Sequence, residues 1–143
     1  MKTFTPLSFA ILLSFIACGT YAAQDIDDRD AWLKDATDLI EAGRIDGLED
    51  KVKTTLGENM HEDVTSLLAP LNEVMADHKA VYIDKIDHQE LGQSFDQHVY
   101  AVYYGDREFV FYSFTFARLE NGWQLYALDY ADNLSALNQP VNQ

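Results

Sequence analysis

Cysteine is nearly absent from this chain of 143 residues, and the single one, Cys18, lies in an N-terminal stretch typical of an export signal. Lys2 is followed by the apolar segment FTPLSFAILLSFIA and by small residues ending at Ala22, which favours cleavage there. Cleavage would leave residues 23–143 as one domain without a thiol, so a hydrophobic core rather than disulfides must stabilise it. In the alternative, Cys18 becomes the lipidated first residue. We therefore expect a periplasmic or secreted protein, or one anchored at the envelope through Cys18.

Long hydrophobic runs and basic residues are also scarce. The apolar part of the signal is about 14 residues long, whereas a membrane-spanning helix needs roughly 20, so we expect no membrane insertion after cleavage. The chain has 10 Lys and Arg against 24 Asp and Glu, and loss of Lys2 would change the net charge to 9 − 24 = −15. Such a chain repels phosphate backbones, and this excludes nucleic acid as an expected partner.

Motifs for catalysis and for metal binding are missing too. The four histidines, His61, His78, His88 and His98, lack the spacing of zinc ligands, so no metal site is predicted. The acidic segment DIDDRD at 25–30 does not fit a calcium loop and is interpreted as helix capping. There is no serine nucleophile elbow, phosphate loop or Cys–His pair, and no cofactor is predicted.

Apolar residues between positions 24 and 79 recur at helical spacing. The first predicted helix is capped by Asp27 or Asp28, carries Trp32 on its apolar stripe and stops at Gly43. A capping box of Asp46 and Glu49 would open the second helix, and Gly57 would end it. A third segment, from Val64 to Met75, contains Pro70, and this predicts a kink or break near Ala69.

From residue 80 onward the apolar pattern has a period of two. The segments AVYIDKID, SFDQHVYAVYY, EFVFYSFTFARLE and WQLYALDY are separated by HQELGQ and by the turn sequences Gly105-Asp106 and Asn121-Gly122. This predicts a four-stranded antiparallel meander that ends in a short polar tail from about residue 133. The fold class is therefore α+β, with two or three N-terminal helices packed on a curved sheet.

The two turns also predict which residues share a face of the sheet, because paired residues lie on the same side. If Gly105-Asp106 is a two-residue loop, the numbers of paired residues in that hairpin sum to 211. If Asn121-Gly122 is a two-residue loop, the numbers of paired residues in the last hairpin sum to 243. The face expected to pack on the helices contains Phe95, Gln97, Val99, Ala101, Tyr103, Val110, Tyr112, Phe114, Phe116, Trp123, Leu125, Ala127 and Asp129. The opposite face contains Asp96, His98, Tyr100, Val102, Tyr104, Phe109, Phe111, Ser113, Thr115, Ala117, Gln124, Tyr126, Leu128 and Tyr130.

The second of these faces is too aromatic for an ordinary wet surface. A second copy of the chain is its simplest cover, and cover by the chain itself is the alternative. A typical dimer hides about 800 Å² per partner, which several Tyr and Phe side chains can supply. The predicted interface residues are Tyr100, Tyr104, Phe109, Phe111, Tyr126, Leu128 and Tyr130.

The ending FTFARLENGWQLYALDY, with its Gly-Trp hairpin after N-terminal helices, resembles small exported bacterial proteins of the nuclear-transport-factor-like (cystatin-like) superfamily. The resemblance spans about Trp32 to Asp132. It implies a cone-shaped fold in which helices and a concave sheet face enclose a pocket, used for ligand or protein binding and in some relatives for catalysis. No catalytic motif of the family matches this sequence.

The pocket implied by this resemblance is expected to be lined by Gln97, Tyr103, Tyr112 and Trp123 and to suit a small apolar ligand. Asp129 is expected beside them, opposite Phe114, where burial would raise its pKa. The first hypothesis is an exported binding or assembly module that uses this pocket or the aromatic face. The alternative is an isomerase- or dehydratase-type enzyme with Asp129 as general base and Tyr103 or Tyr112 as hydrogen-bond donor.

Overall fold

The computed structural model describes residues 24–137, so Cys18 and the predicted signal lie outside the described residues. Three helices come first: α1 (Arg29–Glu41), α2 (Ile45–Leu56) and, after the short 3-10 turn η1 (Glu58–Met60), α3 (His61–Met75). Among the described helices, none has the length and apolar content needed to cross a membrane.

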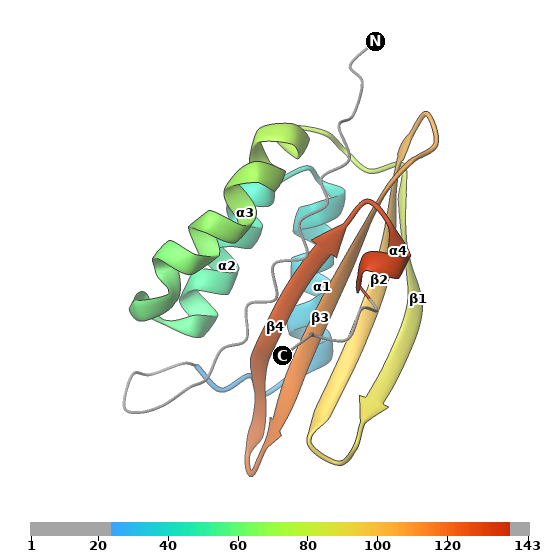
Figure 1. The fold of residues 1–143 in the computed structure, drawn as a ribbon. Helices are drawn as coiled ribbons and strands as arrows, with labels where there is room; N and C mark the ends of the chain where they lie inside the picture. The colour runs from blue at the N-terminus through green and yellow to red at the C-terminus, as the bar shows by residue number, and fades with distance from the viewer. Residues whose placement is uncertain (1–23, 138–143) are drawn as a thin grey trace.

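Four strands follow the helices and form one antiparallel sheet in the order β1-β2-β3-β4. They are β1 (Tyr82–Leu91), β2 (Phe95–Gly105), β3 (Glu108–Leu119) and β4 (Gly122–Ala131), and the short helix α4 (Leu134–Leu137) comes last. Figure 1 shows α1, α2 and α3 on one side of the sheet and α4 on the other. We call these sides the helix face and the outer face. The predicted α+β class and the meander are confirmed.

The helix ends agree in part with the sequence. Asp28 caps α1 by accepting a hydrogen bond from the backbone N–H of Ala31 at 2.9 Å, as predicted. Gly43 follows the helix with a positive φ of 73°, and a Cβ there would lie 2.6 Å from the carbonyl oxygen of His78, so only glycine fits. Gly57 is the C-cap of α2, also as predicted.

Two local predictions about the helices are wrong. Helix α2 begins two residues earlier than expected, after Arg44, and has no side-chain cap, because the Asp46 carboxylate accepts from the N–H of Gly47 instead. Helix α3 runs without a break through Pro70. Leu67, Leu68 and Leu71 are buried on either side of that proline, and this packing outweighs the hydrogen bond that the proline cannot donate.

The predicted pairing of β2 with β3 is wrong by one residue. The loop is Asp106-Arg107, both with positive φ, and Gly105 pairs with Glu108. A bulge between Tyr103 and Gly105 adds one residue to β2, so that paired numbers sum to 212 along the rest of the hairpin. Every side chain of β2 therefore lies on the face opposite to the one expected.

The pairing of β3 with β4 differs from the prediction in two places. Leu119 pairs with Gly122, so the loop is Glu120-Asn121, one residue earlier than predicted, and the sum of paired numbers falls from 243 to 241, which leaves the faces near the turn unchanged. A second bulge, opposite the step from Thr115 to Phe116, inserts Tyr126 into β4. Beyond that bulge the faces of β4 are exchanged relative to the prediction. As a result, Leu128 and Tyr130 belong to the helix face and Ala127 and Asp129 to the outer face.

The hydrophobic core lies between the helices and the helix face. Trp32 of α1 packs edge-on against Phe114 and Phe116 of β3, with ring centroids 5.8 and 5.6 Å apart. At the other end of the sheet, the hydroxyl of Tyr130 donates to the carbonyl of Leu67 in α3 at 2.6 Å. These contacts join residues far apart in sequence and fix the helices over β3 and β4.

Candidate functional site

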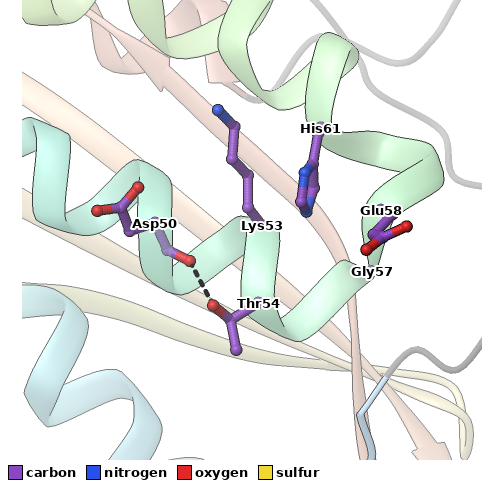
Figure 2. Close-up of a pocket in the computed structure, with 6 residues that line it drawn as sticks. All are labelled: Asp50, Lys53, Thr54, Gly57, Glu58 and His61. Carbon is purple, nitrogen blue, oxygen red and sulfur yellow. Dashed lines mark hydrogen bonds between the residues drawn. The ribbon is translucent and has the colours of Figure 1, made fainter.

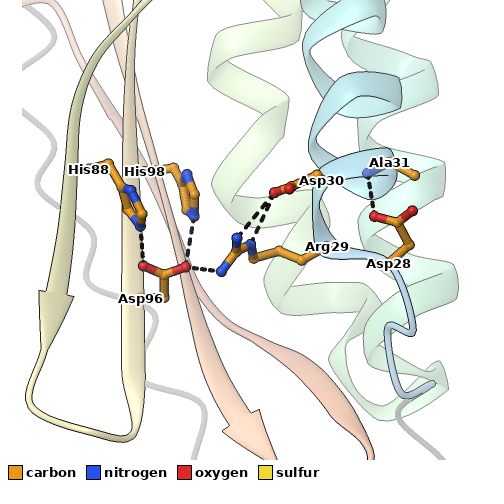
Figure 3. Close-up of polar contacts among 7 residues, drawn as sticks. All are labelled: Asp28, Arg29, Asp30, Ala31, His88, Asp96 and His98. Carbon is orange, nitrogen blue, oxygen red and sulfur yellow. Dashed lines mark hydrogen bonds and ion pairs between the residues drawn. The ribbon is translucent and has the colours of Figure 1, made fainter.

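A cluster of polar side chains lies at the end of the helix face where β2 begins. Asp96 is buried there, next to the wholly buried His98, and His88 of β1 stands directly across from His98 in the strand pairing. The carboxylate of Asp96 accepts from Nε2 of His88 on one oxygen and from Nε2 of His98, at 3.0 Å, on the other (Figure 3). Two imidazoles therefore converge on one carboxylate.

Arg29, the first residue of α1, joins this cluster from the helix side. Its guanidinium pairs with Asp96 and, at 3.1 Å, with its neighbour Asp30 (Figure 3). The backbone of Ile26 exchanges two hydrogen bonds with Trp123, of 2.7 and 2.9 Å, and so holds the start of α1 against β4. The Arg29 guanidinium lies 4.5 Å from the centre of the Trp123 ring, a cation–π contact that fixes its position.

The electrostatics of the cluster define its protonation. Burial alone would raise the pKa of Asp96, but the hydrogen bonds from His88 and His98 and the charge of Arg29 outweigh burial and hold the pKa below its usual value. Burial lowers the pKa of His98, so this imidazole is neutral near pH 7. Its Nε2 then carries the proton donated to Asp96, and its Nδ1 has no hydrogen-bond partner among the described residues.

A cavity of about 410 Å³ lies beside this cluster at the β1–β2 turn. Charged side chains line it, including Asp96, Glu90 and Arg118, together with the ring of Trp123. The guanidinium of Arg118 lies 5.0 Å from the centre of the same ring. The cavity gives small solutes an approach to an otherwise buried carboxylate.

A second hollow, of about 510 Å³, lies on the surface at the C-terminal end of α2 (Figure 2). Its polar groups are already partnered: the hydroxyl of Thr54 donates to the carbonyl of Asp50 at 2.8 Å, and Lys53 pairs with Glu49 at 2.6 Å. Figure 2 shows no convergence of the remaining side chains, His61 and Glu58 included, on a common point. We do not assign a site there.

The four residues expected to line one pocket are divided between the two faces. Tyr112 and Trp123 lie on the helix face, and Gln97 and Tyr103 lie on the outer face, because the β2 register differs from the prediction. Tyr112 is fully buried in the core, with its hydroxyl 3.3 Å from that of Tyr104. Of the four, Trp123 lines the cavity beside Asp96.

Asp129 was expected on the helix face opposite Phe114, and this placement is wrong. It lies on the outer face and pairs with Ser113. Burial raises its pKa to about 6, as the sequence predicts, although the apolar surroundings are those of the outer face. Tyr112, one of the two donors considered for an enzyme, points to the opposite side of the sheet. The constellation of Asp129 with Tyr112 is therefore not formed.

The predicted interface residues are also divided. Tyr100, Tyr104, Leu128 and Tyr130 pack into or against the core on the helix face, which corrects the prediction for these four. Phe109, Phe111 and Tyr126 lie on the outer face as predicted. The rings of Tyr82, Tyr103, Phe109 and Phe111 follow one another across β1, β2 and β3, with successive centroids 5.1, 4.9 and 6.1 Å apart. We call these four rings the aromatic row.

The outer face has partial cover from its own chain. Helix α4 contacts β3 and β4 on this side, contrary to the expectation of a tail without structure (Figure 1). Exposed apolar side chains remain: Val81 is 62% exposed, Tyr82 is 47% exposed, and Leu134 of α4 is also exposed. Since Tyr82 is part of the aromatic row, that row is not fully covered by the described part of the chain.

The histidine cluster was missed in the sequence for a reason that lies in β1. His88 and His98 are ten positions apart, and only the β1–β2 pairing, which closes with Leu91 opposite Phe95, places them side by side. The polar residues of HQELGQ, which follow Asp87, were interpreted as a loop, although β1 continues to Leu91. Extending the strand into that segment would have placed His88 on β1, but its partner in β2 would still have depended on the position of the β1–β2 turn.

Comparisons with known proteins add one similarity of fold. No family model and no curated protein matches this chain. A solved structure from Thiobacillus denitrificans, described as a calcium/calmodulin-dependent protein kinase type II association domain, aligns with 75% of this chain and 96% of its own length. The identity is 11% and the TM-score 0.48. Membership of the nuclear-transport-factor-like superfamily therefore stays a prediction from the sequence.

Proposed function

We propose that this protein is an exported binding or assembly module that forms a homodimer through the outer face of its sheet. The aromatic row is the observation that carries the proposal. Its four rings lie on the side away from α1, α2 and α3, and Tyr82 at its end is about half exposed. Surface aromatic side chains in such a row are typical of protein interfaces, since they bury a large area with little loss of conformational freedom.

The size of the outer face fits this role. Four strands spaced about 4.8 Å apart and ten residues long cover roughly 600 Å², and helix α4 with Leu134 adds to the surface at one edge. A standard interface needs about 800 Å² of accessible surface per partner. Two copies packed face to face can reach that area only if most of the outer face takes part, including both the aromatic row and the Phe95–Tyr126 ring pair.

Charge sets the conditions under which the dimer forms. Each chain has a net charge of −14, so two copies repel one another at long range. The aromatic row contains no ionisable group other than tyrosine, whereas the rest of the outer face carries Asp84, Asp87 and Asp129, so association across the whole face also brings like charges closer together. Raising the salt concentration screens the long-range repulsion and is therefore expected to strengthen the dimer.

Light scattering of the purified chain after gel filtration tests the proposal. We expect twice the mass of one chain at tens of micromolar and a shift to monomer in Phe109→Ser and Tyr82→Ser. The matched control is Leu39→Ser, a half-exposed apolar residue on α1, which should stay dimeric. A monomeric parent protein at these concentrations, or a dimer that survives both outer-face changes, would refute the interface.

Export is part of the same proposal and has a separate test. Intact mass of the protein isolated from the bacterial envelope distinguishes a chain starting at Ala23 from one starting at an acylated Cys18. The first result supports a periplasmic or secreted dimer and the second a membrane-tethered one. Recovery of the uncleaved chain from the cytoplasm would contradict export.

The pocket is a weaker basis for function than the outer face. A small apolar ligand remains a prediction, but the cavity beside Asp96 is lined by charged side chains and suits polar solutes better. We therefore base the proposed function on assembly and treat the Asp96 cluster separately.

A further inference from the structure

We propose that His88, Asp96 and His98 bind a divalent transition-metal ion, for which Zn²⁺ is the probe. One ligand atom from each of the three residues lies within 4.8 Å of the other two. The residues come from neighbouring positions of β1 and β2, so the sheet itself holds them in place. This site is independent of the outer face, because the cluster lies on the opposite side of the sheet.

The donor atoms are already close together, and binding an ion requires a change of ring orientation. The two imidazoles are stacked, with centroids 4.4 Å apart and an angle of 14° between their planes, and both direct Nε2 at the Asp96 carboxylate. Zinc sits about 2.0–2.2 Å from such nitrogen and oxygen ligands in an approximately tetrahedral arrangement. Donor atoms around one ion are then roughly 3–3.5 Å apart. Because the lone pair of Nε2 lies in the plane of the imidazole, at least one ring must turn out of the stack to bind the ion, and the His88 side chain, which is 43% exposed, has room to do so.

Protonation is compatible with binding. A metal ion needs the lone pair of Nε2, so each neutral imidazole must carry its proton on Nδ1 when the ion is bound. Nδ1 of His98 has no partner among the described residues, so binding of the ion must offset the cost of an unpaired N–H at that buried atom.

Arg29 plays the part of a supporting residue. It contacts the Asp96 oxygen that also faces His98, leaving the oxygen at His88 free to bind the ion. Carboxylate ligands are usually oriented by such hydrogen bonds. Asp30 and Glu90 lie near the cluster together with Arg29, Lys85 and Arg118, so the local charges largely offset one another. The net charge of −14 on the whole chain attracts cations.

The donor set selects the class of ion. Two imidazole nitrogens and one carboxylate oxygen suit Zn²⁺ and other first-row transition ions, whereas Ca²⁺ and Mg²⁺ prefer oxygen ligands throughout. Three protein ligands leave a fourth position for water or a small ligand. Asp96 also lines the cavity described above, so a small ligand in that cavity would contact the carboxylate of the site.

Calorimetric titration of the chelator-treated full mature chain with Zn²⁺, together with native mass spectrometry, tests the site. We expect one ion per chain with a dissociation constant below about 10 μM. His88→Ala should weaken binding at least about 10-fold, and since the His88 side chain is 43% exposed, this variant should keep the fold. His61→Ala and His78→Ala are the matched controls and should bind as the parent chain does.

Cobalt provides a second readout that does not depend on stability. Co²⁺ in a four-coordinate site gives intense visible absorption bands, which we expect in the parent chain and in His61→Ala but not in His88→Ala. A 100-fold excess of Mg²⁺ should leave both the bands and Zn²⁺ binding unchanged. Binding weaker than about 10 μM, or binding of equal strength in His88→Ala and the parent chain, would overturn the proposal.

Discussion

The two faces of the sheet have nearly the same share of aromatic residues but differ in what surrounds them. On the helix face, rings such as Phe114 and Phe116 are fully buried against Trp32, and the buried carboxylate of Asp96 is held by His88, His98 and Arg29. On the outer face, the aromatic row is partly exposed. The partly buried carboxylate of Asp129 has its pKa raised by burial, and no positive charge contributes to that shift. The helix face is complete within one chain, whereas the outer face is not.

This difference teaches that apolar content alone does not identify the core of a sheet. Aromatic residues on the helix face contribute to the stability of the single chain because helices remove them from water. The same residue types on the outer face can contribute fully only when another surface covers them. Substitutions on the two faces should therefore separate stability from association.

The largest expected effect comes from truncating one ring on each face. Phe114→Ala should lower the free energy of unfolding by about 3–5 kcal/mol, since it leaves a cavity beneath Trp32. Phe109→Ala should cost less than about 1.5 kcal/mol in the isolated chain, because the ring is already half exposed, yet it should weaken the dimer. Urea unfolding at low protein concentration measures both. Equal losses would remove the distinction between the faces.

The ion pair of Arg29 with Asp96 should have the next largest effect. Arg29→Met is expected to destabilise the protein by about 2 kcal/mol, because it leaves the buried carboxylate with only its histidine partners. The control is Lys34→Met, which removes the exposed pair with Asp38 and should change stability by less than about 0.5 kcal/mol. Thermal unfolding measures the stability of the two variants. An Arg29→Met variant as stable as the parent chain would mean that the ion pair with Asp96 does not stabilise the helix face.

Asp129 gives the outer face a pH dependence of its own. The folded chain keeps the Asp129 proton up to about pH 6, whereas an exposed aspartate loses it near 3.8, so this residue makes stability fall as the pH rises between those values. Asp129→Asn should therefore stabilise the protein by roughly 1–2 kcal/mol at pH 8 and hardly at all at pH 4. Denaturant titrations at both pH values measure the gain in stability. An equal gain at pH 4 would mean that ionisation of Asp129 is not its cause.

The smallest effect concerns single hydroxyl groups. Tyr130→Phe removes the donor to the buried carbonyl of Leu67 and should cost about 1 kcal/mol. Tyr126→Phe, on the outer face, should change the stability of the single chain by no more than a few tenths of a kcal/mol. Chemical denaturation measures the free energy of unfolding of both variants. A larger loss of stability in Tyr126→Phe than in Tyr130→Phe would show that the outer face has a closed polar network.

The arrangement of elements could be predicted from the sequence because it depends on local signals. The cap at Asp28, the glycine after α1 and the period of two from residue 80 onward each act within a few residues, and each corresponds to an observed feature. Pro70 shows the limit of this approach, since burial of its neighbours keeps α3 intact.

The assignment of faces could not be predicted, and the reason is physical. Bulges at Tyr104 and Tyr126 each shift the alternation by one residue, and a sheet that is apolar on both sides gives no pattern to reveal the shift. The same errors separated Gln97 and Tyr103 from Tyr112 and misplaced Asp129. The histidine cluster required the β1–β2 pairing, which no turn motif in HQELGQ specifies.

Distances between spin labels on two copies of the chain test the dimer most directly. The sequence after Ala22 contains no cysteine, so single labels can be placed at Gln89→Cys on the outer face and at Ser66→Cys on the exposed side of α3. Pulsed electron resonance should give a clear distance between the two Gln89 labels and a longer one, or none, between the two Ser66 labels. An absent signal at Gln89, or a shorter distance at Ser66, would contradict association through the outer face.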